Sequence, residues 1–343
     1  MMSLRKRIRH QLEVLLTRMA LCVIPRLPRP WVLAFARCAA RLAYFVVPGL
    51  RRVGLANLEL AYGDSISESE KQRILRQSLT TFTIVILDVF WFTRKPRERL
   101  SRYVHFPEGL LESVGDGPEI YVTGHLGNWE TLGQAVANAG LPLHSIAAPL
   151  ANPHIDKFFI PSRELTGQKI LSSEGALRGF LKALRQGACV AVLLDQNTKP
   201  SEGGVFVPFF GLPAPVSTGP ASLALRTESQ IVFGYCLLEP DGSYIVHSPG
   251  RITPDEVRAF SALGDDASDQ LTAEIAGRIE QAIRTYPEAW QWTYKRWKYI
   301  APGHTREEYP AYARPLRETE QSKARIVVRG QDGPSVREPS PPG

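Results

Sequence analysis

The amino-acid sequence predicts an α/β fold in which a mixed, largely parallel central sheet is flanked by helices, with an amphipathic helical segment before it. Short β-rich runs alternate with helix-like stretches between residues 119 and 285, as in layered α/β domains. The 343 residues are 44% hydrophobic and 22% charged, close to the globular average. A chain of this length and composition buries a sizeable core, so disorder throughout is excluded.

Positive charge is concentrated in the first 60 residues. Eleven of the 41 Lys and Arg residues lie there beside two acids, Glu13 and Glu59, whereas the rest of the chain carries 30 basic and 32 acidic residues. A basic footprint at one end argues against nucleic acid as a partner and for an anionic surface. A membrane is the simplest surface of this kind.

Two amphipathic helices are expected in this segment. The apolar residues that share a helical face are Ile8, Leu12, Leu15, Leu16, Met19 and Val23 in the first helix, and Val32, Phe35, Ala39, Leu42 and Val46 in the second. Glu13 and Arg18 interrupt the first apolar run, which argues against a cleaved signal peptide. We therefore expect residues 1–50 to lie at a membrane interface. Ordinary helices that cover a core, or a tilted span near residues 11–27, are the alternatives.

The remaining elements follow from local patterns. Ser67 and Glu70 begin a helix that runs to about Phe92. The expected strands are 119–123, 143–148, 188–194, 231–238 and 243–248, and the expected helices between and after them are 174–186 and 266–285. We expect a catalytic domain over 51–302 and an extended, disordered tail over 303–343. The four cysteines lie far apart without CxxC spacing, so neither a disulfide framework nor a zinc site is expected.

The sharpest motif is GHLGNWE at residues 124–130, directly after the first of these strands. A strand that ends here and leads into a helix places His125 at the carboxyl edge of the sheet, where α/β folds bind ligands. If His125 lies in the loop and Glu130 in the first helical turn, Glu130 accepts the proton of one ring nitrogen and leaves the other as a free base. The alternative is a loop histidine with a capping glutamate.

Four further segments accompany this motif. They are FFIPSR at 158–163, LLDQ at 193–196, GVFVPFFG at 204–211 and PEAWQWTYKRWK at 287–298. Asp195 follows an apolar run, where parallel strands open into a site, and it is expected either to position substrate or to cap a loop. The third segment predicts a buried strand and turn. Trp290, Tyr294 and Trp297 are expected on one helical face, packed inside or at a membrane interface.

Together these segments resemble the lipid A secondary acyltransferases of lauroyl and myristoyl type, within the lysophospholipid acyltransferase superfamily. The resemblance runs from the N-terminal helix to about Ala301. It implies transfer of a fatty acyl chain from acyl carrier protein, or acyl-CoA, to a hydroxyl of a lipid A precursor at the cytoplasmic face of the inner membrane. It also implies that His125 and Glu130 are catalytic and that Arg163 binds substrate. Asn128, Asp195 and Gln196 are further expected substrate-binding residues, and no cofactor or metal is expected. Asn197 departs from the acid that relatives often carry there.

Other activities lack their motifs. G-x-S-x-G, GxGxxG and the P-loop pattern are absent from the sequence, and no second histidine stands at metal-ligand spacing from His125. Two alternatives remain. One is acylation of another acceptor, such as a lysophospholipid, an aminolipid or a glycosylated phosphoinositide. The other is a noncatalytic lipid-binding protein at a membrane.

Overall fold

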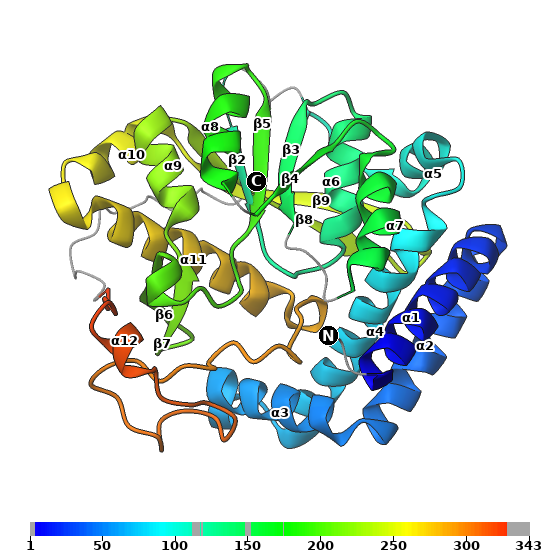
Figure 1. Cartoon of the computed structure of the whole chain (residues 1–343), viewed down its shortest axis with the longest axis horizontal. Helices are drawn as coiled ribbons and strands as arrows, with labels where there is room; N and C mark the ends of the chain where they lie inside the picture. Colours follow the sequence, from blue (N-terminus) through cyan, green and yellow to red (C-terminus); the bar gives the residue numbers. More distant parts are fainter. Residues whose placement is uncertain (1–3, 112–116, 118, 148–151, 174, 328–343) are drawn as a thin grey trace, which may run out of the picture.

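A seven-stranded sheet forms the centre of the computed structural model, which describes residues 4–111, 117, 119–147, 152–173 and 175–327 (Figure 1). Its strands, in spatial order, are β1 (Val104–His105), β9 (Tyr244–Ile252), β8 (Gln230–Leu238), β2 (Glu119–Thr123), β5 (Cys189–Leu193), β3 (Leu143–Ala147) and β4 (Lys169–Ser172). Strands β8, β2, β5, β3 and β4 are parallel, whereas β9 runs antiparallel to β8 and pairs with β1. The predicted mixed, largely parallel sheet is confirmed.

Alternation along β2 separates the two faces of the sheet. Ile120 and Val122 belong to the main core, together with side chains from α8 (Ala176–Arg185), α9 (Gly219–Thr227) and α11 (Ala267–Thr285). The opposite face carries Tyr121 and Thr123 and lies beneath α6 (Trp129–Asn138), with α7 (Pro153–Glu164) next to it. Helices α8 and α11 confirm the expected helices 174–186 and 266–285. Residue 174 and residue 148, the last of the expected strand 143–148, lie outside the described residues.

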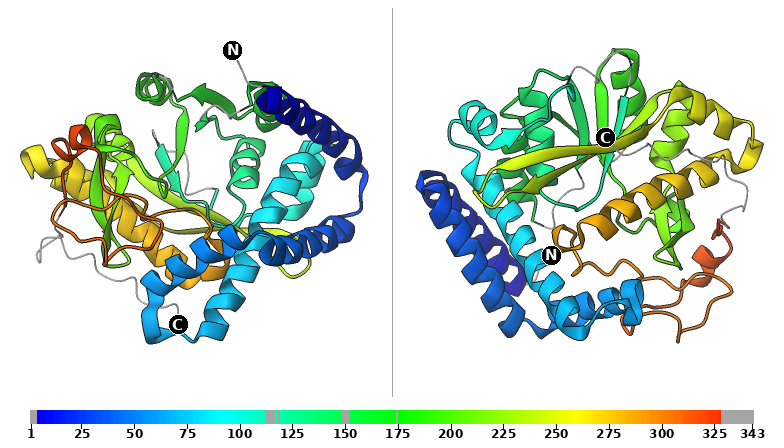
Figure 2. Two further views of the ribbon diagram at one scale, coloured as in Figure 1. Left: turned by 60° about the horizontal axis from the view of Figure 1, so that its bottom comes forward. Right: turned by 180° about the vertical axis from the view of Figure 1, so that it is seen from behind.

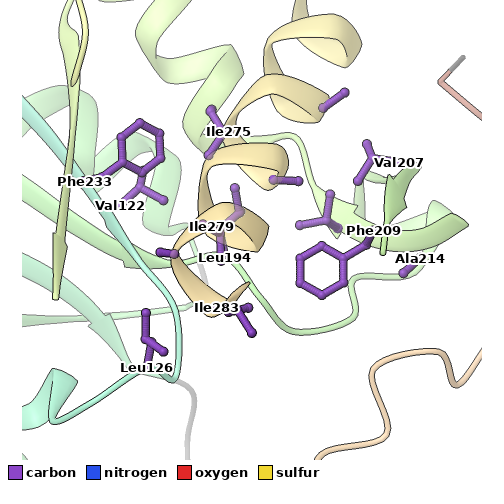
Figure 3. Close-up of a cluster of buried hydrophobic side chains, with 14 of the residues drawn as sticks. Val122, Leu126, Leu194, Val207, Phe209, Ala214, Phe233, Ile275, Ile279 and Ile283 are labelled. Carbon is purple, nitrogen blue, oxygen red and sulfur yellow. The ribbon is translucent and has the colours of Figure 1, made fainter. Parts of the chain in front are cut away.

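A hairpin of β6 (Gly204–Phe209) and β7 (Leu212–Ser217) packs on the outer side of α11. Figure 3 shows Ile275, Ile279 and Ile283 of α11 between the sheet and the hairpin, from which Val207 and Phe209 point inward. The predicted buried strand and turn at 204–211 is confirmed.

The N-terminal part consists of α1 (Leu4–Val23), α2 (Arg29–Val46), α3 (Pro48–Tyr62) and α4 (Glu68–Trp91). Ser67 caps α4 as predicted, because its hydroxyl accepts the N–H of Glu70. Helices α1 and α2 both pack on α4, at the end of the molecule away from α10 (Pro254–Ser261) (Figure 2). A short α5 (Pro96–Tyr103) then leads into β1.

The predicted apolar face of α1 is confirmed, and it points to solvent. Its six predicted residues are all between 52% and 57% exposed. The exposed large apolar residues of α2 and the residue after it are Trp31, Phe35, Leu42, Phe45, Val46 and Val47, whereas Val32 is buried. A basic helical segment with two such faces has the composition of an interfacial anchor.

Among the described residues, α4 is the one helix long and apolar enough to cross a membrane, and 61% of its most apolar window is buried inside the protein. Helices α2 and α3 meet the same test only as a pair, with a 90° bend between them. The suggested span near residues 11–27 does not meet it.

Two expectations about the C-terminal part are wrong. Residues 290–298 form turns and bridges rather than a helix, and Trp290 and Trp297 are buried in the core, which excludes them as interfacial anchors. The segment 303–327 is packed rather than disordered: it contains α12 (Glu318–Gln321), and Val327 donates its N–H to the carbonyl of Phe206. The rest of the expected tail, residues 328–343, lies outside the described residues.

Candidate active site

The loop between β2 and α6 holds His125 at the carboxyl edge of the sheet, as predicted. Gly127 has a φ of +63°, and a Cβ there would lie 2.2 Å from the carbonyl oxygen of Cys236, so only glycine fits. Asn128 caps α6 by accepting the N–H of Thr131 at 2.9 Å. Because α6 begins at Trp129, Glu130 lies in its first turn, also as predicted.

The carboxylate bonded to His125 is Asp195. Its Oδ1 lies 2.7 Å from His125 Nδ1, and its Oδ2 accepts the backbone N–H of His125 at 2.7 Å. Trp290 donates its indole N–H to the same carboxylate at 2.8 Å. Complete burial would raise the pKa of Asp195, but the charge and hydrogen bonds of His125, aided by Trp290, hold that pKa below its usual value. An ionised Asp195 accepts a hydrogen bond from the Nδ1–H and leaves Nε2 as the free base.

The predicted pairing of His125 with Glu130 is therefore wrong, because His125 bonds Asp195 and Glu130 bonds another residue. Glu130 instead holds Arg163 by two parallel hydrogen bonds, 2.7 Å from Nε and 2.5 Å from Nη2. The helical start of α6 turns Glu130 toward α7, where Arg163 lies in the last turn. Burial alone would lower the pKa of Arg163, but the hydrogen bond and charge of Glu130 outweigh it and raise that pKa.

Nε2 of His125 faces a cavity of about 360 Å³ between the sheet and α6. The Trp129 and His125 rings pack edge to face, with 4.6 Å between the ring centroids. His125, Glu130, Arg163 and Gln196 form a polar group on the cavity wall. The cavity also extends over an apolar wall that includes Phe106, Leu110, Leu132, Val136, Leu141 and Leu143.

The predicted substrate-binding residues separate into two groups. Gln196 and Arg163 line the cavity. Asp195 and Asn128 do not: both are buried, and their polar atoms bond within the protein, so the structure gives them positioning contacts instead of substrate contacts. The prediction that Asp195 and Asn128 bind substrate is therefore wrong.

A buried network below the loop was not predicted. Asn128 donates its amide to Asp88 and to the hydroxyl of Tyr244, and Asp88 pairs with Arg29 at the start of α2. Burial would lower the pKa of Arg29, but Asp88 and Tyr244 raise it. A signal was present in the sequence, because Asp88 is the single charge in the apolar run over residues 82–92, and buried charges require partners.

The described residues contain no cluster of three His, Cys, Asp or Glu side chains arranged to hold a metal ion.

Comparison with known proteins identifies relatives along most of the chain. The model of the bacterial lipid A biosynthesis acyltransferase family matches residues 2–299. The phosphatidylinositol mannoside acyltransferase of Mycobacterium tuberculosis (strain CDC 1551 / Oshkosh) is 25% identical over 213 residues, which cover 60% of this chain and 62% of that protein. The protein of the same description from Mycolicibacterium smegmatis is 25% identical over 177 residues, covering 50% and 54% of the two chains. The chain thus aligns with less than two thirds of either relative.

Proposed function

Since the chain belongs to the bacterial lipid A biosynthesis acyltransferase family, we propose that it transfers a fatty acyl chain from a thioester donor to a hydroxyl of an anionic glycolipid in a membrane. One observation carries this proposal: an Asp195-oriented His125 faces a largely apolar cavity that has further polar side chains on its wall. The arrangement suits a substrate with a reactive head and a long hydrocarbon tail.

His125 acts as the general base in this reaction. The acceptor hydroxyl attacks the thioester carbonyl carbon while its proton passes to Nε2. The tetrahedral intermediate then collapses: the carbon–sulfur bond breaks, and the proton on Nε2 passes to the departing sulfur. The products are an ester and a free thiol. Neither ring nitrogen of His125 bonds a serine or cysteine side chain: Nδ1 contacts the Asp195 carboxylate and Nε2 contacts the Gln196 amide. His125 therefore activates the acceptor hydroxyl itself, and the acyl group moves directly to the acceptor.

Asp195 orients the imidazole and stabilises the imidazolium that forms during attack. The Glu130–Arg163 pair sits beside it on the cavity wall. Arg163 is held by two parallel bonds, so its guanidinium is fixed where an anionic substrate group enters. That group is a phosphate of the acceptor or of the donor's phosphopantetheine arm.

Two acceptors share the required chemistry. The family description names lipid A biosynthesis, and the relatives are described as phosphatidylinositol mannoside acyltransferases. A lipid A precursor and a mannosylated phosphatidylinositol both present sugar hydroxyls near phosphate. The donor is acyl carrier protein or acyl-CoA, which carry the same phosphopantetheine thioester. The exposed apolar faces of α1 and α2 support attachment to a membrane. We place this attachment at the cytoplasmic face of the inner membrane.

The test is a transfer assay with purified protein in anionic liposomes. Lauroyl, myristoyl and palmitoyl thioesters of acyl carrier protein and of CoA are each supplied with a lipid A precursor or with mannosylated phosphatidylinositol, and the products are analysed by mass spectrometry. We expect an acyl ester on one acceptor and at least about a hundredfold less in His125→Ala. Binding of these lipids without turnover would identify a noncatalytic lipid-binding protein instead. A covalent acyl-enzyme would refute direct transfer.

A further inference from the structure

Gln196 contacts the very nitrogen that must receive the proton. Its amide Nε2 lies 3.1 Å from His125 Nε2, and its side chain lines the cavity. Because Nδ1 of His125 keeps its proton and donates it in a hydrogen bond to Asp195, the lone pair of Nε2 accepts a hydrogen bond from the Gln196 amide. In the resting protein this amide therefore stands where the acceptor hydroxyl must bind before attack.

Attack on the thioester creates a second requirement. The carbonyl oxygen becomes an oxyanion bonded to the same carbon as the attacking oxygen, so it develops close to His125 Nε2. Donors already aimed at such an oxygen supply a large part of the rate enhancement in acyl transfer.

Four backbone N–H groups near His125 are committed to other bonds. The N–H groups already bonded are those of His125 to Asp195, Gly127 to Ala289, Asn128 to Cys236 and Thr131 to the Asn128 side chain. Trp290 donates its indole N–H to Asp195, and Arg163 directs Nε and Nη2 at Glu130. Gln196 thus supplies a donor that already stands within hydrogen-bond distance of the reacting nitrogen.

The backbone on both sides of Gln196 is fixed while its side chain is exposed. Leu194 donates its N–H to the carbonyl of Thr123 at 2.9 Å. Asn197 is also held in place. Its N–H donates to the Tyr294 hydroxyl at 3.0 Å, and its side-chain amide donates to the carbonyl of Lys295 at 2.9 Å. Rotation of side-chain torsions alone therefore redirects the amide within the site.

We propose that Gln196 is a catalytic residue that leaves His125 when the acceptor hydroxyl arrives and donates its amide N–H to the thioester oxyanion. This role rests on the proposed acyl transfer and adds the electrophilic half of its catalytic machinery. It assigns two successive partners to one amide: the lone pair of His125 in the resting protein and the oxyanion during reaction.

The test compares two acceptors with one acyl thioester donor. The lipid acceptor makes contacts along the site, whereas methanol makes none, yet both reactions pass through the same oxyanion. Gln196→Leu keeps nearly the same size and removes the donor. We expect kcat to fall about 10²- to 10³-fold with both acceptors, the loss typical of one oxyanion donor, while the KM for the donor and the melting temperature stay unchanged. Gln196→Asn, which keeps the amide, should recover part of the rate.

Gln186→Leu is the matched control, because Gln186 is exposed at the end of α8, away from the catalytic cavity. It should leave both rates unchanged. A loss with the lipid but not with methanol would make Gln196 an acceptor-binding residue and overturn the proposal. A higher kcat of Gln196→Leu with both acceptors would mean that Gln196 only blocks His125 in the resting protein. An unchanged kcat would mean that Gln196 has no role in the reaction. Either result also overturns the proposal. Failure of the acyltransferase function itself is distinguishable, since wild-type protein would then consume no thioester.

Discussion

The carboxylate of Asp195 lies 2.7 Å from Nδ1 of His125, although 70 positions separate the two residues in the chain. Strands β2 and β5 are parallel neighbours, and Thr123 pairs with Leu193 in their register. The two side chains therefore emerge at the same edge of the sheet, two residues beyond that pair. This relationship makes Asp195, rather than Glu130, the group that sets the tautomer of the base.

Asp195→Asn should lower kcat by about 10³- to 10⁴-fold with little change in KM. The amide holds the geometry but favours the wrong tautomer of the imidazole and cannot stabilise the imidazolium. Steady-state kinetics with varied donor and varied acceptor measure this. Glu130→Gln is the matched comparison and should lose much less in kcat, since Glu130 does not touch His125. An equal or larger loss in Glu130→Gln would restore Glu130 as the partner of the base.

Glu130 and Arg163 should behave as one unit. Glu130→Gln and Arg163→Lys each remove the two-point contact, so the double variant should be scarcely worse than either single one. The interaction free energy from the double-mutant cycle should be about 1–3 kcal/mol in kcat/KM. Lys retains the charge of Arg163 but not its planar fork, and should recover only part of the activity lost in Arg163→Ala. Additive losses would show that the two residues act separately.

Gly234→Leu should shorten the acyl chain that the protein accepts. Gly234 lines the cavity, and a Cβ there would meet nothing closer than Leu132 at 3.8 Å, so the Cβ of the new side chain fits without a clash. Each methylene of the donor that loses its burial costs about 0.8 kcal/mol, or roughly fourfold in kcat/KM. Competition among donors of different length measures the shift. Gly49→Leu, outside the cavity, is the control. An unchanged preference for acyl-chain length in Gly234→Leu would mean that the acyl chain of the donor binds elsewhere.

Asp195 should also give the protein a specific acid sensitivity. Its pKa is lower in the folded protein than its ordinary value of 3.8, so its stabilising effect is fully present above that value and is lost as the pH falls through the folded pKa. The difference in unfolding free energy between wild type and Asp195→Asn should shrink as the pH falls from about 5 to below about 4. Urea unfolding across this range measures it. A difference that grows on acidification would contradict the direction of the shift.

Replacement of Leu15 and Leu16 by Glu should release the protein from anionic liposomes. Both side chains are 55% exposed on α1, and burial of a leucine contributes roughly 1.5–3 kcal/mol. The double variant should therefore bind at least about a hundredfold more weakly in a flotation assay. Leu263→Glu, equally apolar and 50% exposed after α10, is the control and should bind as wild type. Normal flotation of the double variant would refute the membrane face.

The sequence by itself determined the features that local patterns encode. Apolar periodicity located α1, α4, α8 and α11, and β-rich runs located five of the seven strands, all but β1 and β4. The strand before GHLGNWE fixed His125 in a loop and Glu130 in the first turn of α6. Four polar residues of the cavity, His125, Glu130, Arg163 and Gln196, were chosen from sequence, whereas Ser145 and Gln168, which also line it, were not. These predictions held because they depend on neighbouring residues and on the direction in which a strand ends.

Only the tertiary structure decided which of these groups meet. The pairing of His125 with Asp195 depends on the order of β2 and β5 in the sheet, and the pairing of Glu130 with Arg163 depends on how α7 packs beside α6. The tryptophan segment after α11 illustrates the same limit. Its spacing favoured a helix, but Trp290 is extended, forms an antiparallel bridge with Leu126 and donates its indole N–H to Asp195. Spacing along a chain constrains backbone geometry, whereas contacts between distant segments are selected by the free energy of packing the whole fold.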